Sequence, residues 1–440
     1  MKRLNPVTTG IVGTIGVFML LLLGMPIALA LMLIGFAGIW HLTSLHAALP
    51  VVARTIYEVS GSYSYIVIPL FLVMGSFAGI SGSIEDLYNT FDKWLRRLPG
   101  GLAVATVAAC AGFSAVSGSS VATAAAMSGI AYPEMRKFNY SPRLAAGTIA
   151  GGGTLGFLIP PSIGFVVFGM LTEQSVGKLL IAGIFPGIIL ALTFIILIVL
   201  QVKRNPGLAP ANLEPVSRGE KILALKDIWG IALVFLIVMG GIYRGWFTPS
   251  EAGAAGATLL FLFALLKRKL TFRNLFGALQ ETVRVSAMVL FLIAGATVYT
   301  YFLGLSTIPA QLVGWVAGLA VSRYVVLVAI LLVYLFLGCF IDAVSMMVLT
   351  LPVVYPLILQ LGFHPIVFGV LCVLMMDAGL ITPPMGLNLF TIAGVAKDAT
   401  MEEIYWGALP FVIPILVVVA IVVVFPETAL FLPRMMLGGR

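Results

Sequence analysis

Two Pro-Pro pairs interrupt long apolar stretches of the chain, at Pro160-Pro161 and at Pro383-Pro384, and each follows a glycine, Gly156 or Gly379. A proline cannot donate a backbone hydrogen bond and disfavours a helical conformation in the residue before it, so each pair predicts a break between two half-helices. The first half-helix would present unpaired carbonyl oxygens, which suit Na⁺, and the second would present free N–H groups, which suit a carboxylate. The pattern therefore favours binding of a cation together with an organic anion.

Polar tips occur in the middle of two further apolar stretches. The stretch 101–137 has a serine-rich tip at 117–120, and the stretch 323–360 has a tip at 338–342. Non-helical backbone at membrane depth is tolerated only where protein or a water-lined cavity satisfies it. We therefore expect two re-entrant hairpins with buried tips. Serine-rich tips can also serve only to let helices pack closely.

Two carboxylates lie at predicted membrane depth, Asp342 and Asp377. An intramembrane carboxylate is energetically costly and is a functional hypothesis by default. Asp342 is therefore the strongest single candidate for holding a cation, either Na⁺ or a proton, or for fixing the second tip. Asp377 could equally be a helix-end or hydrogen-bonding residue.

Enzymatic chemistry finds no support in the sequence. Gly177-Lys178 is followed by Leu179 and is not a phosphate-binding P-loop, and no HExxH motif or nucleophile-elbow serine is present. The cysteines lie inside apolar stretches without metal-ligand spacing, at Cys110, Cys339 and Cys372. We expect neither an enzyme nor ATP hydrolysis, and a secondary transporter driven by an ion gradient is the economical interpretation.

The elements that must position these residues occur twice, because an offset of 223 relates the two Pro-Pro pairs. The same offset superposes Pro26 on Pro249, Tyr132-Pro133 on Tyr355-Pro356, and Pro142 on Pro365. Prolines are costly inside apolar segments, so their common spacing indicates duplication of one unit. We predict a first repeat at 1–205, a cytoplasmic linker at 206–227 and a second repeat at 228–433.

Composition places both repeats in a membrane, since the 440 residues are 61% hydrophobic and only 10% charged. Apolar runs near 20 residues recur along the chain, as a helix needs to cross about 30 Å of hydrocarbon. Ten all-α crossings are predicted, at 7–23, 25–42, 66–84, 142–172, 178–202, 228–244, 249–266, 283–305, 365–395 and 404–432. The broken helices are 142–172 and 365–395. Five crossings per repeat invert the second repeat relative to the first.

Basic residues predict the orientation. The net charge is +8, but the bases are clustered between apolar runs, which is the positive-inside pattern and not a nucleic-acid-binding surface. The clusters place the linker, the 85–100 segment and residues 267–269 in the cytoplasm. If each hairpin crosses the bilayer fully instead, the crossings number fourteen and the repeats are still inverted.

Four motifs combine these features. They are Gly24-Met-Pro26-Ile-Ala-Leu-Ala, Gly-x-x-x-Pro-Pro-Ser ending at Ser162, Gly338-Cys-Phe-Ile-Asp342, and Gly379-Leu-Ile-Thr-Pro-Pro-Met-Gly-x-Asn388. Together they resemble the large membrane subunit of TRAP (tripartite ATP-independent periplasmic) transporters. Gly24 leaves too few residues before it for four crossings, so we expect the small subunit of such a system to be a separate chain.

The resemblance implies an elevator-type mechanism, in which a transport domain of hairpins and broken helices slides against a scaffold. It implies import of an organic acid with Na⁺ and without ATP. The implied partners are a small four-helix membrane subunit and a periplasmic substrate-binding protein. The implied location is the cytoplasmic (inner) membrane of a bacterium or archaeon.

Carried over residue by residue, the resemblance implies two Na⁺ sites that flank the substrate. The implied substrate contacts are Ser117, Ser119, Ser162, Thr382 and Asn388. The implied Na⁺ ligands are Ser117, Gly118, Ser120, Gly156, Pro160, Gly338, Asp342, Gly379, Thr382, Pro383 and Met385, with Asp377 as a further candidate.

Two other classes of protein stay open. A stand-alone Na⁺- or H⁺-coupled carboxylate transporter of the broader ion-transporter superfamily would share the inverted hairpins but need no binding protein. A membrane-embedded enzyme or lipid-handling protein would need a catalytic cluster, which the sequence does not indicate.

Overall fold

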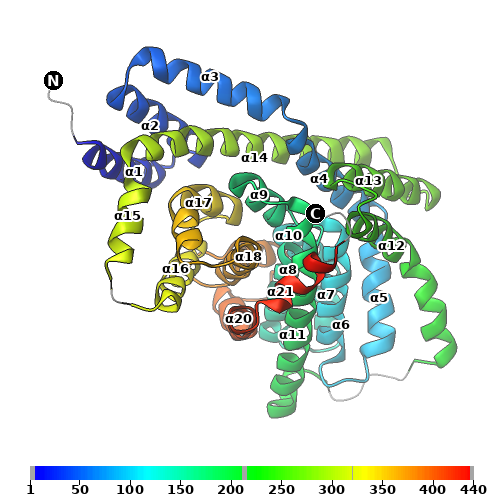
Figure 1. Ribbon diagram of the computed structural model, residues 1–440. Coiled ribbons are helices and arrows are strands. Elements are labelled where there is room, and N and C mark those ends of the chain that lie inside the picture. Colours follow the sequence, from blue (N-terminus) through cyan, green and yellow to red (C-terminus); the bar gives the residue numbers. More distant parts are fainter. Residues whose placement is uncertain (1–4, 211–215, 320, 437–440) are drawn as a thin grey trace.

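The computed structural model describes residues 5–210, 216–319 and 321–436, which form 21 α-helices and two short 3-10 helices and contain no β-strand (Figure 1). Backbone inside a membrane must satisfy its N–H and C=O groups internally, and a helix does so within one apolar segment. The predicted all-helical membrane fold is confirmed.

The helices of the first half are α1 (Pro6–Leu22), α2 (Ile27–Leu42), α3 (Leu45–Gly61), η1 (Tyr63–Ile66), α4 (Val67–Ile80), α5 (Ser83–Leu95), α6 (Gly101–Ser117), α7 (Ser120–Lys137), α8 (Pro142–Leu158), α9 (Ile163–Thr172), α10 (Val176–Ala182), α11 (Ile184–Arg204) and η2 (Pro206–Leu208). Those of the second half are α12 (Arg218–Arg244), α13 (Pro249–Leu266), α14 (Phe272–Ser306), α15 (Ile308–Ala317), α16 (Arg323–Gly338), α17 (Ala343–Gln360), α18 (Pro365–Leu380), α19 (Leu387–Val395), α20 (Met401–Val424) and α21 (Glu427–Met435).

The offset of 223 relates helix bounds as well as prolines. It carries both ends of α7 onto both ends of α17, and the start of α8 onto the start of α18. The short helix after each Pro-Pro pair, α9 or α19, begins within one residue of the shifted position and ends at it. Two hairpins, α6–α7 and α16–α17, are thus each followed by one broken helix, α8–α9 or α18–α19.

Seven helices in the described part of the chain are long and apolar enough to cross a membrane, or eight if the bent pair α8 and α9 counts as one span. This is fewer than the ten predicted crossings. The helices α1 and α2 have only 17 and 16 residues, and the halves α18 and α19 have 16 and 9. By contrast, α17 has 18 residues and is one of the seven, so its length alone would permit a crossing.

Apolar runs in the sequence do not predict the helices α3 and α5. Each is amphipathic, so apolar residues lie on one face only and form no continuous run. The α5 helix has Glu85 and Asp86 in its first turn and Lys93 in its last, which complements the helix dipole. Its other face buries Leu87 and Tyr88. The predicted cytoplasmic segment 85–100 is therefore mostly helical.

Part of the predicted linker 206–227 is helical. The α12 helix begins at Arg218, ahead of the predicted crossing at 228, because the Ser217 hydroxyl caps it by accepting a hydrogen bond from Glu220 N–H (3.2 Å). Residues 211–215 of the predicted linker lie outside the described residues.

At the other end of the chain Pro426 separates α20 from α21, so the predicted crossing 404–432 is two helices.

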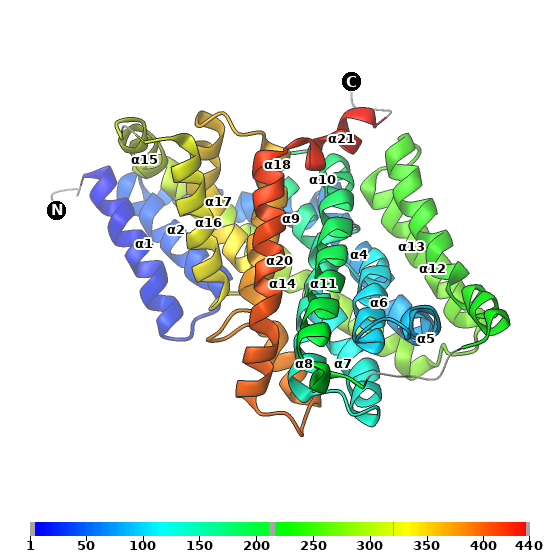
Figure 2. The ribbon, with the colours of Figure 1, turned by 90° about the horizontal axis from the view of Figure 1, so that it is seen from below.

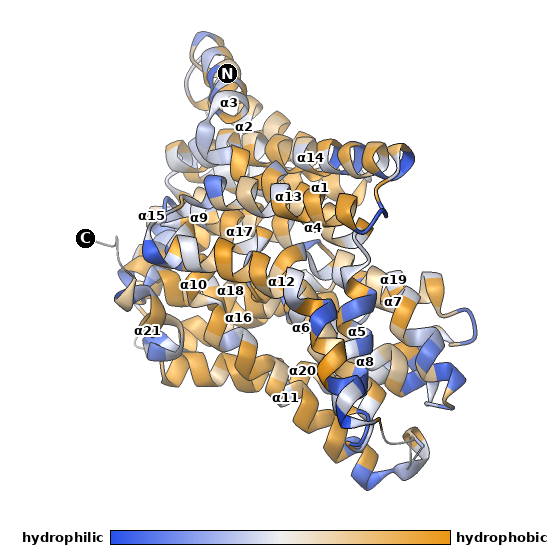
Figure 3. Cartoon of the chain, turned by 90° about the vertical axis from the view of Figure 1, so that its right-hand side faces the viewer, coloured by the Kyte–Doolittle hydropathy of each residue, from blue (hydrophilic) through white to orange (hydrophobic). Residues whose placement is uncertain are grey.

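The two repeats pack around a common centre. In Figure 2, α1 and α2 lie at one end of the molecule and α12 and α13 at the other, with the hairpins and broken helices between them. Two of these helices are the most deeply buried: every residue from Leu144 to Leu158 of α8 and from Ile366 to Leu380 of α18 is buried. Hydrophobic residues cover α11 along its length, while hydrophilic residues gather at helix ends and loops (Figure 3).

Candidate substrate and ion site

The first hairpin turns at its serine-rich tip. The α6 helix ends at Ser117, and Gly118 takes a left-handed conformation with φ 66°, which glycine adopts without strain. The Ser119 hydroxyl then caps α7 by accepting a hydrogen bond from Ala122 N–H (3.3 Å). The sequence folds this way because small residues and a capping serine stand at the turn.

The tip of the first hairpin lies on the first Pro-Pro break. Ile163 N–H, at the start of α9, donates to the carbonyl oxygen of Gly118 (3.2 Å). A Cβ atom at Gly156 would lie 2.5 Å from the carbonyl oxygen of Ser119, so glycine allows α8 and the tip to approach this closely. The predicted partners 117–120 and 156–162 are therefore brought together.

The first break frees a carbonyl oxygen. In a continuous helix Gly156 and Phe157 would accept hydrogen bonds from residues 160 and 161, but both of these are prolines. The carbonyl of Phe157 accepts instead from the hydroxyl of Ser162, whereas that of Gly156 has no helical partner. The hydroxyls of Ser117 and Thr123 share a hydrogen bond (2.9 Å), and Thr123 Oγ1 would lie 2.6 Å from a Cβ at Gly156. These hard oxygen donors are of the type that alkali and alkaline-earth cations prefer.

The second tip repeats this arrangement with a carboxylate. Asp342 caps α17 by accepting a hydrogen bond from Ser345 N–H (3.0 Å), at the position that Ser119 has in the first hairpin. A Cβ at Gly379 would lie 2.6 Å from the Cα of Gly338, so the second tip lies equally close to the second break. The carbonyl of Gly379 differs from that of Gly156, because it accepts from Thr382 N–H (3.1 Å).

A cavity of about 380 Å³ joins both tips to α4 and α14. It contains four of the predicted site residues, Ser117, Ser119, Ser120 and Asp342. The sequence interpretation misses two polar groups of its wall, Ser76 from α4 and Glu281 from α14. No sequence signal marks Glu281, which lies just before the predicted crossing 283–305. Among the described residues, the wall carries two carboxylates and no basic side chain.

Three predicted substrate contacts do not line this cavity. The Ser162 hydroxyl turns inward to the carbonyl of Phe157, and the Thr382 hydroxyl donates to the carbonyl of Ala378 (2.6 Å). Asn388 is fully buried against α8. Met385, a predicted Na⁺ ligand, is 51% exposed beside the second break.

Asp377 lies in α18, is fully buried and accepts a hydrogen bond from the Ser120 hydroxyl (3.0 Å). Asn388 donates from Nδ2 to the carbonyl of Ala150 in α8 (3.5 Å). One oxygen of each, Oδ2 of Asp377 and Oδ1 of Asn388, has no hydrogen-bond partner among the described residues. The structure thus joins Asp377 to the first hairpin, which sequence spacing does not indicate.

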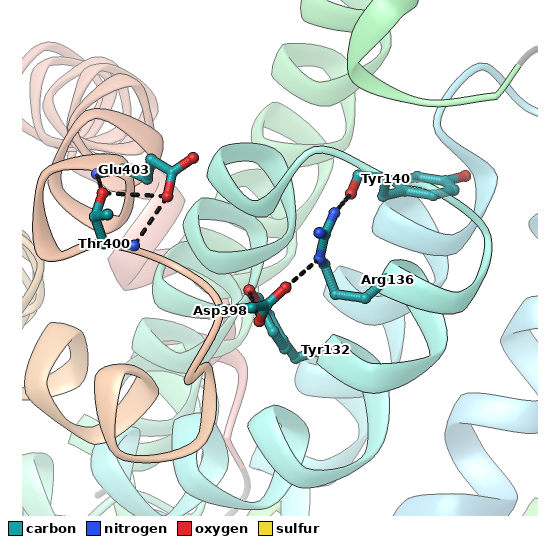
Figure 4. Close-up of polar contacts among 6 residues, drawn as sticks. All are labelled: Tyr132, Arg136, Tyr140, Asp398, Thr400 and Glu403. Carbon is teal, nitrogen blue, oxygen red and sulfur yellow. Dashed lines mark hydrogen bonds and ion pairs between the residues drawn. The ribbon is translucent and has the colours of Figure 1, made fainter.

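The base of the first hairpin is tied to the loop that follows α19 (Figure 4). Asp398 accepts hydrogen bonds from Tyr132 Oη (2.8 Å) and from Arg136 Nε (2.7 Å), and Arg136 also donates to the carbonyl of Tyr140 (2.5 Å). The hydrogen bond from Arg136 holds the pKa of Asp398 below its usual range. The first hairpin is therefore fastened to the second broken helix at both its tip and its base.

These features define a multi-pass membrane protein built from paired hairpins and broken helices around a cavity whose largely apolar wall carries a few polar side chains. The chain belongs to the DctM component family of tripartite ATP-independent periplasmic transporters, whose model matches residues 14–428. The resemblance seen in the four sequence motifs is confirmed.

Individual relatives agree with this family. The chain is 37% identical over 388 residues to the C4-dicarboxylate TRAP transporter large permease protein DctM of Pseudomonas aeruginosa, covering 87% of this chain and 89% of that protein. It is 33% identical over 413 residues to the 2,3-diketo-L-gulonate TRAP transporter large permease protein YiaN of Escherichia coli, covering 92% and 94%. Its fold resembles the crystal structure of the Alcanivorax borkumensis YdaH transporter, with a TM-score of 0.61 at 14% identity over 89% of this chain and 88% of that one.

Proposed function

We propose that this chain is the permease of a binding-protein-dependent secondary transporter that imports an organic acid together with Na⁺. The observation that carries the proposal is the cavity in which both hairpin tips meet α4 and α14. Its polar wall is formed by serines, Asp342 and Glu281. Two of the relatives are named as C4-dicarboxylate and 2,3-diketo-L-gulonate permeases, which supports an organic acid as the class of substrate.

The charge of the cavity supports cation coupling. The described wall of the cavity has two carboxylates and no basic side chain. These carboxylates would repel an organic anion that entered the cavity unless a cation accompanied it. The free carbonyl of Gly156 and the Ser117 hydroxyl offer oxygen ligands for Na⁺ close to this wall. The N–H groups at the starts of α7 and α17 add partial positive charge. Coupling to Na⁺ would thus neutralise the substrate and supply the driving force.

The position of the cavity supports an elevator mechanism. Ile84 lines it, and nearby Gly82 lies next to the ammonium group of Lys269, one of the clustered basic residues. The positive-inside pattern therefore assigns this end to the cytoplasm. A second cavity, of about 750 Å³, lies between the α9–α10 loop and the start of η1, on the side of α4 away from Gly82. Sliding of the hairpins and broken helices along α4 and α14 would carry the substrate between the two ends.

The proposed partners are a small four-helix membrane subunit and a periplasmic binding protein that delivers the acid. The proposed location is the cytoplasmic membrane of a bacterium or archaeon. A stand-alone transporter would work without either partner, so reconstitution separates the two possibilities.

The test is uptake of labelled organic acids into vesicles that contain this chain with and without its two partners. We expect uptake only with both partners, only with an inward Na⁺ gradient, and without ATP. Uptake by the chain alone would favour the stand-alone transporter. Uptake that persists without Na⁺ and follows a pH gradient would move the coupling ion to H⁺.

A further inference from the structure

A second small cavity lies where the start of α8, the end of α11 and the start of α20 meet. Its volume is about 260 Å³, and its wall includes Arg143 of α8, Arg204 of α11 and Trp406 of α20. The three helices pack against one another, and α11 and α20 lie side by side in Figure 2. No described residue of its wall also lines the cavity at the hairpin tips, so the two sites are separate.

The side chains of this cavity carry positive charge that the protein does not neutralise. Among the described residues, the Arg143 side chain has one partner, because its Nε donates to the carbonyl oxygen of Trp406 (3.1 Å), and the Arg204 side chain has no ion pair or hydrogen bond. The described wall contains no carboxylate. A guanidinium group presents several N–H donors in a planar fork that fits a phosphate. Two such groups at one cavity therefore favour a phosphate group as ligand.

The cavity lies at the membrane surface on the predicted cytoplasmic side. The α11 helix has 21 residues and belongs to one of the candidate membrane spans, and its length of about 30 Å matches the hydrocarbon layer. Arg204 is its last residue and lies next to the linker that the basic clusters assign to the cytoplasm. Trp406 is 51% exposed, as suits an indole at the interface. Basic pockets between membrane helices on this side bind the headgroups of anionic lipids.

A row of exposed apolar side chains leads along α11 to the cavity. Its members are four residues apart, and Arg204 continues the same spacing: Ile188, Leu192, Ile196 and Leu200. Residues four apart lie on one face of a helix. The neighbouring α20 adds exposed Leu409, Ile413 and Val417. The two helices thus offer an apolar surface to acyl chains, and this surface ends at two guanidinium groups.

We propose that this face binds a phospholipid with an anionic headgroup from the cytoplasmic leaflet. Its phosphate lies between Arg143 and Arg204, and its acyl chains lie along α11 and α20. The occupant is a lipid and not a free phosphate ion, because the basic cavity continues into the exposed apolar row. The inference goes beyond the proposed function, since it uses none of the residues assigned to substrate or Na⁺.

The experiment measures thermal unfolding of the purified full chain in detergent with increasing mole fractions of one lipid. The two lipids compared are phosphatidylglycerol, which is anionic, and phosphatidylcholine with the same acyl chains, which has no net charge. Phosphatidylglycerol should stabilise the wild type saturably and at a lower mole fraction than phosphatidylcholine. Arg143→Gln and Arg204→Gln should each raise the half-saturating fraction of phosphatidylglycerol about fivefold, and the double variant should raise it at least about tenfold.

Lys203→Gln is the matched control, because Lys203 is exposed and precedes Arg204 at the end of α11 but does not line the cavity. It removes the same charge from the same helix end, and it should leave the response to phosphatidylglycerol unchanged. Inorganic phosphate added without lipid should not stabilise the wild type. The unfolding temperature of each variant without lipid checks that it folds, as expected for substitutions of exposed side chains.

Equal stabilisation of the wild type by the two lipids would overturn the proposal and leave this face to another occupant, such as a membrane-spanning partner. An unchanged preference for phosphatidylglycerol in the double variant would place the anionic lipid elsewhere on the chain. An equal loss of preference in Lys203→Gln would reduce the effect to the overall charge of this helix end. Stabilisation by inorganic phosphate as large as that by phosphatidylglycerol would make the cavity a site for the free ion.

Discussion

Asp342 combines two roles that substitutions can separate, since it caps α17 and its carboxylate borders the cavity. Asn is as good a helix cap as Asp, so Asp342→Asn should preserve the fold and remove only the charge. If that charge helps to hold the coupling ion, initial uptake at low Na⁺ should fall at least about tenfold, equivalent to about 1.4 kcal/mol of binding. Asp342→Ala should in addition lose about 0.5–2 kcal/mol of stability with the cap.

Uptake of the Asp342→Asn variant at the wild-type rate, with unchanged Na⁺ dependence, would remove Asp342 from the ion site. The freed carbonyls and serine hydroxyls at the tips would then have to hold the cation without it. Expression level and unfolding temperature serve as the control for folding.

At the scale of elements, the contact between the first hairpin and α8 depends on Gly156. A methyl group there would meet the carbonyl oxygen of Ser119 at 2.5 Å, so Gly156→Ala should lower stability by about 1–3 kcal/mol as an overpacking substitution. Gly129 in α7 is the matched control, since no atom lies within 4 Å of its added Cβ. Gly129→Ala should be neutral or stabilise by up to about 1 kcal/mol. Equal thermal stability of the two variants would contradict this tight docking.

The contact at the base of the same hairpin should depend on pH. The pKa of Asp398 is lowered by Arg136, so the pair stabilises the fold above the ordinary pKa of an aspartate, and this stability is lost as pH falls through the lowered value. The Arg136 side chain is 34% exposed and that of Asp398 is 51% exposed, so solvent screens the pair and we expect it to contribute well under about 1 kcal/mol of stability. The difference in unfolding temperature between wild type and Asp398→Asn should therefore be present at neutral pH and disappear in acid.

At the scale of the whole molecule, the basic clusters predict which end of the cavity faces the cytoplasm. The three native cysteines are buried and give little background labelling. We expect Asn205→Cys, next to the linker, to react with an impermeant thiol reagent only after the membrane is permeabilised. Thr307→Cys, after α14, should react in intact cells. The reverse pattern would invert the topology and turn the described cavity towards the periplasm.

The sequence by itself determined features that depend on neighbouring residues. The two breaks follow from prolines that lack an N–H, and the two hairpin tips follow from polar residues in the middle of apolar stretches. The all-helical fold follows from apolar runs, and duplication follows from the spacing of prolines. These are local or periodic properties, so they can be read without the folded structure.

Only the tertiary structure decided which polar groups meet. Ser120 and Asp377 are 257 positions apart and are joined because α8 packs against both α7 and α18. Glu281 reaches the cavity because α14 passes the hairpin tips, although its sequence surroundings give no sign of this. Ser162 and Asn388 turn away from the cavity because nearby carbonyl oxygens offer them buried hydrogen bonds. Such pairings arise from the packing of whole helices, which spacing along one segment cannot specify.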